Sequence, residues 1–220
     1  FKYISEIGKS ITKISLPVSF QNIFILIGFL SFIAITGHIS TLAQAASNVV
    51  FSSLTISLMP CFGFGIAVQT LVGNNIGSGD IQKAKYYGFE TGKVASIYTV
   101  FVGLIFTFFP RFVLVLITND SAVIEAAVPA IRIAGFGQIF YAMGVVLANG
   151  LQASGQTMFV MLAEVIVNWF IFVPLAFLLG VVLDLGLKGA WAALPFYVLL
   201  YSGVIFIKFK YGNWQKLKKV

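Results

Sequence analysis

Charged residues are scarce in this chain of 220 residues. Asp, Glu, Lys and Arg make up only 10% of the chain, against roughly 25% in an average soluble domain. Hydrophobic residues make up 59%, and the mean hydropathy is +0.99. This composition excludes an ordinary soluble domain and indicates a chain that lies in a lipid bilayer. The net charge of +7 does not indicate a nucleic-acid partner, because the cations lie between apolar runs.

Cysteine and histidine are almost absent, with only Cys61 and His38 in the chain. One cysteine cannot form an intramolecular disulfide, and these two residues cannot build a metal site across the thickness of a membrane. A serine or cysteine nucleophile would need a histidine base within reach. We therefore expect no metal or cofactor and no enzymatic activity, and we place His38 in a solvated loop. The chain starts at Phe1 without a signal peptide, so we expect it to be part of a longer protein or trimmed.

Six apolar segments are each long enough for the roughly 20 residues that a bilayer crossing requires. Turn or charged residues separate them, and the segments are 14–35, 45–72, 95–117, 126–153, 157–183 and 190–208. The sequence therefore predicts an all-α membrane protein, a bundle of six transmembrane helices that forms a single domain over 1–220.

Each of the six segments contains one proline, in order Pro17, Pro60, Pro110, Pro129, Pro174 and Pro195. Proline is tolerated in membrane helices because neighbouring groups satisfy the freed carbonyls. One interpretation is an ordinary helix kink. The other is a hinge for a conformational cycle, for which Pro17, Pro60 and Pro174 are the candidates.

The distribution of cations predicts an orientation, because Lys and Arg accumulate in short cytoplasmic loops. One side of the predicted bundle carries Lys2, Lys9, Lys13, Lys83, Lys85, Lys93, Lys208, Lys210, Lys216, Lys218 and Lys219. The other side carries Asp120, Glu125 and Asp184 with Lys188, and with Arg111 and Arg132 near helix ends, where they could snorkel or pair with the acids. Both termini are therefore predicted to be cytoplasmic.

The stretch 60–85 passes from an apolar helix to a polar turn. Its small residues Gly63, Gly65 and Ala67 favour close approach of helices in lipid. The residues from Asn74 to Asp80 are typical of a loop. We therefore expect a membrane boundary in this stretch.

Polar side chains inside the apolar segments are costly and usually face the bundle interior or a watery cavity. The candidates for a substrate or ion path are Gln21, Asn22, Gln138, Tyr141, Glu164 and Asn168. Glu164 is the only carboxylate deep in a segment, and Asn168 lies one turn further on the same helix face. A carboxyl group removed from water would suit a proton carrier or a cation ligand. The alternative is that Glu164 only hydrogen-bonds to neighbouring helices.

Three motifs carry a resemblance to a known family. The first comprises Pro60, Gly63, Ala67, the run from Leu71 to Gly77, Gly79, Asp80 and Ala84; the second runs from Asn149 to Thr157; the third runs from Gly186 to Ala192. In order and spacing they are similar to motifs of the multidrug and toxic compound extrusion (MATE) transporters. The chain resembles the C-terminal six-helix lobe of these proteins.

The resemblance implies a cation-coupled secondary antiporter, driven by H⁺ or Na⁺, that exports organic, often cationic, compounds by alternating access. It also implies an N-terminal lobe, or a second copy, as partner, besides the lipid bilayer and a small organic substrate. The location implied is a bacterial or archaeal inner membrane. The chain departs from the family pattern at Ile25, Tyr141 and Gln152, where some branches have Glu, Asp and Arg, so the family's C-lobe cation site is not carried over.

Two alternatives remain open at this point. A lipid-linked precursor flippase of the same superfamily would share the helical plan but need a strongly cationic cavity for pyrophosphate, and only Arg132 lies near a span interior. A non-transporting membrane anchor or assembly subunit would use the polar residues only to join helices.

Overall fold

Helices joined by short turns form the described structure, a computed structural model that covers residues 2–215, with side chains described for 11–214. In this range there is no strand, and the elements are α1 (Lys2–Ile39), α2 (Thr41–Gly77), α3 (Ile81–Phe108), α4 (Pro110–Val115), α5 (Ser121–Ala153), α6 (Thr157–Val167), η1 (Asn168–Phe172), α7 (Val173–Phe177), η2 (Leu178–Val182), α8 (Gly186–Tyr211) and η3 (Asn213–Gln215). Six helical stretches are long and apolar enough to cross a membrane. The predicted bundle of six transmembrane helices is confirmed.

The helices extend beyond the apolar segments predicted from the sequence. The predicted segment 14–35 belongs to α1, 45–72 to α2, 126–153 to α5 and 190–208 to α8. The segment 157–183 is the exception, because the stretch from α6 to η2 begins at Thr157 and ends at Val182, one residue before the predicted end. The prediction of a single span over 95–117 is wrong, because α3 begins at Ile81 and ends at Phe108. Polar turns with good helix formers such as Gln82 and Lys83 continue the helix outside the apolar stretch. His38 lies in the last turn of α1 rather than in a loop, and its side chain is exposed.

Pro110 explains the break in the third span. The sequence placed Pro110 inside a helical span. In the structure it occupies the first position of the short helix α4. A proline at this position removes no helical hydrogen bond, because the N–H it lacks would have no partner in the helix. Pro17, Pro60, Pro129 and Pro195 do lie inside helices.

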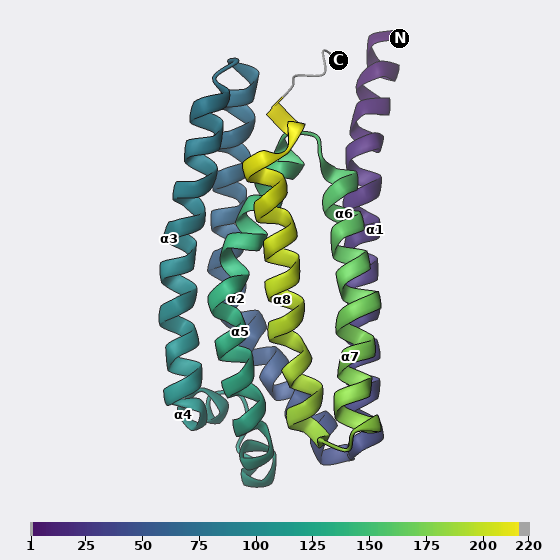
Figure 1. The fold of residues 1–220 in the computed structure, drawn as a ribbon, viewed down its shortest axis with the longest axis vertical. Coiled ribbons are helices and arrows are strands. Elements are labelled where there is room, and N and C mark those ends of the chain that lie inside the picture. The colour runs from purple at the N-terminus through teal and green to yellow at the C-terminus, as the bar shows by residue number, and fades with distance from the viewer. Residues whose placement is uncertain (1, 216–220) are drawn as a thin grey trace.

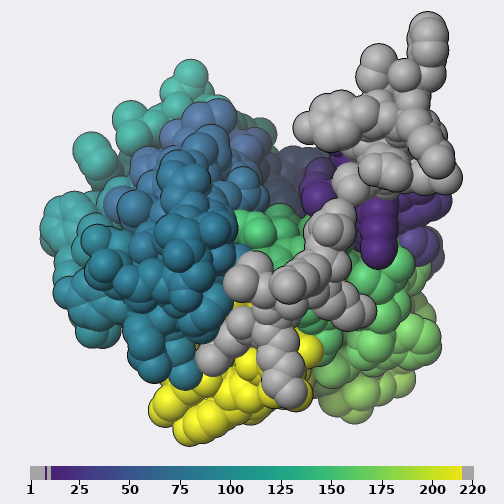
Figure 2. Space-filling view, turned by 90° about the horizontal axis from the view of Figure 1, so that it is seen from above, coloured from purple at the N-terminus to yellow at the C-terminus, as the bar shows by residue number. Residues whose placement is uncertain are grey.

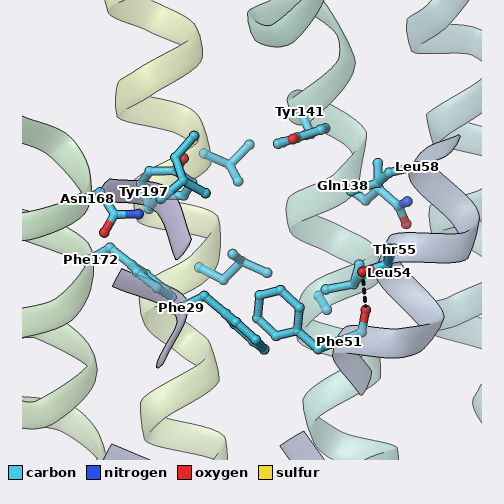
Figure 3. A pocket seen from close by; sticks show the side chains of 14 residues that line it. Phe29, Phe51, Leu54, Thr55, Leu58, Gln138, Tyr141, Asn168, Phe172 and Tyr197 are labelled. Carbon is cyan, nitrogen blue, oxygen red and sulfur yellow. Dashed lines mark hydrogen bonds between the residues drawn. The ribbon is translucent and has the colours of Figure 1, made fainter. Parts of the chain in front are cut away.

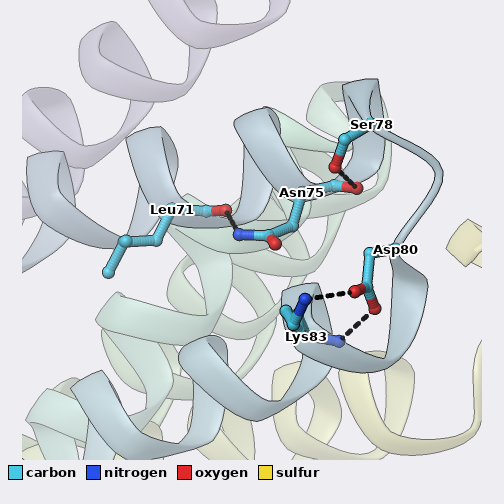
Figure 4. A network of polar contacts seen from close by, with 5 residues as sticks. All are labelled: Leu71, Asn75, Ser78, Asp80 and Lys83. Atoms are coloured by element: carbon cyan, nitrogen blue, oxygen red, sulfur yellow. Dashed lines mark hydrogen bonds and ion pairs between the residues drawn. The ribbon is translucent and has the colours of Figure 1, made fainter.

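The turn between α2 and α3 is shorter than predicted. Asn75 and Gly77 still belong to α2, and only Ser78, Gly79 and Asp80 form the turn. Gly79 has a φ of 81°, a conformation that glycine adopts without steric cost. The Asp80 carboxylate accepts a hydrogen bond of 3.0 Å from the backbone N–H of Lys83, and its other oxygen lies 2.9 Å from the Lys83 ammonium group (Figure 4). Asp80 thus caps α3.

Only one of the three small residues in this stretch lies at a close helix contact. A methyl group added at Gly65 would lie 3.0 Å from the Asn149 side chain on α5. Gly63 has nothing within 4 Å of such a methyl group, and Ala67 is exposed. The expectation of close packing is therefore wrong for Gly63 and Ala67.

Helix α5 lies at the centre of the bundle and packs mainly against α3, α8 and α2. Its buried face is rich in small residues, namely Ala127, Ala130, Ala134, Gly135, Gly137, Ala142, Gly144, Ala148 and Gly150. Such residues allow the close helix approach that stabilises bundles in lipid. The start of α1 and the end of α8 lie at the same end of the bundle (Figure 1). Seen from that end, α2 and α3 lie on one side and α1 and α6 on the other (Figure 2).

Two apolar clusters fill the interior, one toward each end of the bundle. The first includes Phe32, Phe172 and Trp191, and the second includes Leu147 and Phe209. Tyr197 on α8 packs against both clusters. The buried polar side chains described below lie where the two clusters meet.

The fifth span, from α6 to η2, has an irregular backbone. Two π-helical segments, η1 and η2, flank α7, and Pro174 lies in the first turn of α7. The residues Val160, Glu164, Asn168, Phe172, Ala176 and Gly180 are all buried, so every fourth residue faces the core. In a pure α-helix of 3.6 residues per turn, side chains spaced four residues apart would move gradually around the helix axis. The wider π turns correct this drift and keep one face buried along the span.

Candidate functional site

A layer of polar side chains lies inside the bundle and contains most of the residues that the sequence singled out. Glu164 is 3% exposed, Gln138 3%, Asn168 6% and Gln21 8%. Glu164 is the only acidic residue among the buried polar residues of the described part of the chain. Burial of a carboxyl group is costly unless it is hydrogen-bonded or neutralised.

A phenol group on α8 provides a hydrogen-bond partner for the buried carboxyl group of Glu164. The hydroxyl group of Tyr197 donates a hydrogen bond to Oε1 of Glu164. One turn further along α8, the ring of Tyr201 stacks on that of Tyr197, with centroids 6.1 Å apart and an angle of 10° between the planes. Glu164 is thus held between α6 and α8 by an aromatic hydroxyl group.

Glu164 faces a cavity of about 310 Å³. The walls of this carboxyl cavity come from α1, α2, α5, α6 and α8, and its polar lining consists of Gln21, Asn22, Gln69, Tyr141, Asn149, Gln152, Glu164, Tyr197 and Tyr201. Two amide pairs cross its wall: Gln152 donates to Gln21 over 3.0 Å, and Gln69 donates to Asn149 over 2.7 Å. The first pair joins α1 to the end of α5 and the second joins α2 to α5.

A second, more apolar cavity of about 180 Å³ adjoins the first. The two share Ile25, Tyr141 and Tyr197 in their linings. In this aromatic cavity Asn168 and Gln138 lie on opposite sides, with Phe29 and Phe51 at one end and Tyr141 at the other (Figure 3).

Both buried amides of the aromatic cavity retain a free acceptor. Gln138 donates to the hydroxyl group of Ser57 over 2.6 Å. Within the described residues, Oε1 of Gln138 and Oδ1 of Asn168 have no hydrogen-bond partner. Asn168 begins the π segment η1, and its amide packs against the backbone of α1 at Gly28. Unpaired buried acceptors are unusual and favour a ligand or ion that can donate to them or be coordinated by them.

The structure brings all six predicted path residues to these two cavities. Gln21, Asn22 and Glu164 line the carboxyl cavity, Gln138 and Asn168 line the aromatic cavity, and Tyr141 lines both. Asn22 is exposed, at the edge of its cavity. Of the hinge candidates, Pro17 and Pro60 lie inside α1 and α2, and Pro174 lies between the two π segments.

Sequence reasoning missed Tyr197 and Tyr201. Both belong to α8, and their spacing of four residues places them on one helix face. Two tyrosines on one face of an otherwise apolar span could have indicated a buried polar partner, because a buried tyrosine hydroxyl usually finds one.

The chemistry of the site favours a positively charged ligand. Among the described side chains no Lys, Arg or His lines either cavity, whereas one carboxyl group, three phenols and several amides do. Among the side chains described for residues 11–214, there is no group of three or more His, Cys, Asp or Glu that could hold a metal ion. The arrangement suits a proton, a single monovalent cation or an organic cation.

Comparison with known proteins agrees with this architecture. Residues 17–178, well over half of the chain, match the family model described as MatE. The chain belongs to the MatE family. The resemblance to MATE transporters is thereby confirmed.

Relatives of this MatE chain are described as multidrug resistance proteins or as multidrug and toxin extrusion proteins. The probable multidrug resistance protein NorM of Thermotoga maritima is 27% identical over 208 residues, which cover 94% of this chain and 45% of that protein. Multidrug and toxin extrusion protein 1 of Danio rerio is 24% identical over 83% of this chain and 31% of that protein. The chain thus spans less than half the length of these curated relatives. Family membership also confirms that the chain belongs with transporters rather than enzymes.

Solved MATE structures have the same fold as this chain. A crystal structure of MATE in the straight conformation superposes with a TM-score of 0.88 at 17% identity, over 93% of this chain and 46% of that one. A MOP superfamily transporter from Pyrococcus furiosus, described as having a binding pocket of reverse polarity that suggests a different function, gives a TM-score of 0.82 at 18% identity, over 91% and 44% of the two chains. These likenesses establish a MATE-like lobe of six transmembrane helices.

Proposed function

We propose that this chain is the C-terminal lobe of a cation-coupled secondary antiporter that exports organic cations by alternating access. The MatE family is one of multidrug efflux transporters, and the chain has the size of one lobe of the related structures. Alternating access requires a second lobe that rocks against this one around a shared cavity. The partner is the N-terminal lobe of the same transporter or a second copy of this chain.

The observation that carries the proposal is Glu164, the one buried carboxyl group among the described residues, in the wall of a cavity where no described basic side chain lies. In its charged form Glu164 accepts the hydrogen bond from Tyr197 and attracts a cation. When it binds H⁺ or Na⁺, that attraction disappears and an organic cation is released. Gln21, Asn22, Gln138, Tyr141 and Asn168 would guide the substrate or ion along the two cavities.

The irregular fifth span supports a conformational role. Glu164 and Asn168 precede Pro174 on this span, and π segments are frequent at functional sites. We propose that Pro174 is a hinge that moves Glu164 relative to α8, and that Pro17 and Pro60 do the same for α1 and α2.

The charges of the described residues support cytoplasmic termini. Lys13, Lys83, Lys85, Lys93, Lys208 and Lys210 lie toward the end of the bundle that carries the start of α1 and the end of α8. Lys216, Lys218, Lys219 and the side chains of Lys2 and Lys9 lie outside the described residues. We propose an inner membrane of a bacterium or archaeon, with the lysine-rich end in the cytoplasm.

Transport by the whole protein in lipid vesicles tests this function. We expect the Glu164→Gln variant to lose export of a cationic dye driven by a pH or Na⁺ gradient, because an amide cannot exchange its charge. The Glu90→Gln variant is the matched control, since Glu90 is a partly exposed carboxylate on α3 that pairs with Lys93 over 2.6 Å. Comparing a pH jump with a Na⁺ jump identifies the driving ion. Wild-type export and pH dependence in Glu164→Gln would remove Glu164 from the coupling role.

The same vesicles test the two alternative functions. Translocation of a lipid-linked pyrophosphate without dye export would support a flippase, although none of the described residues that line the cavities has the basic side chain that pyrophosphate needs. Absence of both activities would support a structural subunit.

A further inference from the structure

An arginine that the transport site does not use lies at the break between α3 and α4. Arg132 on α5 is exposed and lines a cavity of about 580 Å³ together with Arg111, Phe108, Phe109 and Phe112. This corner cavity is separate from the carboxyl and aromatic cavities, with which it shares no lining residue.

The corner cavity lies at the edge of the hydrocarbon layer. Helix α3 is one of the six stretches that are long and apolar enough to cross a membrane, and it ends at Phe108, in the lining of this cavity. The three phenylalanines are 65–68% exposed, as expected for side chains in contact with acyl chains.

The two arginines differ in how their charge is balanced. Arg111 forms an ion pair of 2.9 Å with Glu125 near the start of α5. Among the described side chains no ion pair or hydrogen bond involves the guanidinium group of Arg132. An unpaired charge at this depth is costly, so a counter-charge from outside the chain would stabilise it.

We propose that the corner cavity binds an anionic phospholipid, with the lipid phosphate on Arg132 and an acyl chain along Phe108, Phe109 and Phe112. The planar guanidinium group matches two phosphate oxygens at once, and basic pockets between transmembrane helices bind anionic headgroups. The apolar wall distinguishes a lipid from a free anion, because inorganic phosphate gains nothing from three phenylalanine rings.

Lipid retention by the intact protein tests this site. The whole transporter that carries this chain is purified, exchanged into equal amounts of phosphatidylglycerol and phosphatidylcholine, and examined by native mass spectrometry. We expect a preference for phosphatidylglycerol in the wild type and its reduction by roughly fivefold in Arg132→Gln, the effect of one cation near an anionic headgroup. Arg132→Lys should keep most of the preference. Lys188→Gln, which removes an exposed cation near the start of α8 at the same end of the bundle, should leave it unchanged.

Several results would overturn the proposal. They are equal retention of both lipids by the wild type, an unchanged preference in Arg132→Gln, an equal loss in Lys188→Gln, and displacement of the lipid by inorganic phosphate. If Arg132→Gln does not fold, Phe112→Ala keeps the charge and removes part of the apolar wall. The Phe112→Ala variant should lower phosphatidylglycerol occupancy by roughly threefold. Unchanged occupancy in this variant would also contradict the proposed lipid site.

Discussion

At the scale of single residues, two glycines determine how closely α3 and α5 approach. Gly103 and Gly135 face each other where the helices cross. A methyl group added at Gly135 would lie 2.7 Å from Cβ of Phe106 and 2.9 Å from the carbonyl oxygen of Gly103. Because the carbonyl oxygen of Gly103 belongs to the backbone, no side-chain rotation can relieve the clash with the added methyl group.

We predict that Gly135→Ala destabilises the protein by about 1–3 kcal/mol, the usual cost of overpacking. Thermal or denaturant unfolding in detergent measures the change. Gly63→Ala is the control, because nothing lies within 4 Å of the added methyl group, and alanine has the higher helix propensity. Equal stability of the two variants would show that the crossing is more adaptable than its geometry suggests.

That certain polar residues would face the bundle interior could be predicted from the sequence, whereas their partners could not. Glu164, Asn168 and Gln138 stand out because polar groups are rare and costly in apolar segments. The contact between Tyr197 and Glu164 joins residues 33 positions apart, and helix packing alone brings them together. The free acceptors in the aromatic cavity likewise depend on neighbours that no local pattern reveals.

At the scale of elements, the α2–α3 hairpin is held by the cap at Asp80. Hydrogen bonds from the side chain and backbone of Lys83 lower the pKa of Asp80 below its ordinary value of 3.8. A lowered pKa in the folded state means that the ionised cap stabilises the hairpin above pH 3.8, and that this contribution is lost as the pH falls through the lowered value.

We predict that Asp80→Ala increases hydrogen exchange in the first turn of α3, above all at the amide of Lys83. Asp80→Asn should exchange almost as slowly as the wild type, because asparagine caps helices as well as aspartate does. Exchange measured by mass spectrometry at neutral pH separates the two. An equal increase in exchange in Asp80→Ala and Asp80→Asn would show that the ion pair with Lys83, rather than the helix cap, stabilises the first turn of α3.

Apolar runs predicted the membrane crossings but not the helix ends. Hydrophobicity marks the part of a helix that lies in lipid, whereas the ends are set by caps such as Ser40 and Asp80 and by breaks such as Pro110. The π segments could not be predicted, because their sequences resemble those of ordinary apolar helix.

At the scale of the whole molecule, the even number of crossings places the α2–α3 and α5–α6 turns at the end that carries the start of α1 and the end of α8 (Figure 1). The connection between α4 and α5 lies at the opposite end. Fold class and family followed from composition and three motifs, since lipid restricts the available architectures to few.

We predict that a cysteine at Ser78 reacts with a membrane-impermeant maleimide only after the cells are permeabilised, whereas a cysteine at Ser121 reacts in intact cells. Both serines are exposed and lie at opposite ends of the bundle. Cys61 is 1% exposed, and Cys61→Ala provides a background without other thiols in the chain. The reverse labelling pattern would invert the proposed orientation.

Because of the two π segments, the contact between the fifth span and α8 depends on how many residues the fifth span contains as well as on which residues they are. Gly180 lies against Ala190 on α8, sixteen positions after Glu164 on the same buried face. Removing one residue between them would turn every later side chain by about 100°, the rotation per residue of an α-helix. The position of the Glu164 carboxyl group and the close packing of Gly180 on Ala190 therefore both depend on the number of residues between them. An insertion or deletion in this interval would turn one of them away from the core, even though Glu164, Gly180 and Ala190 themselves stay the same.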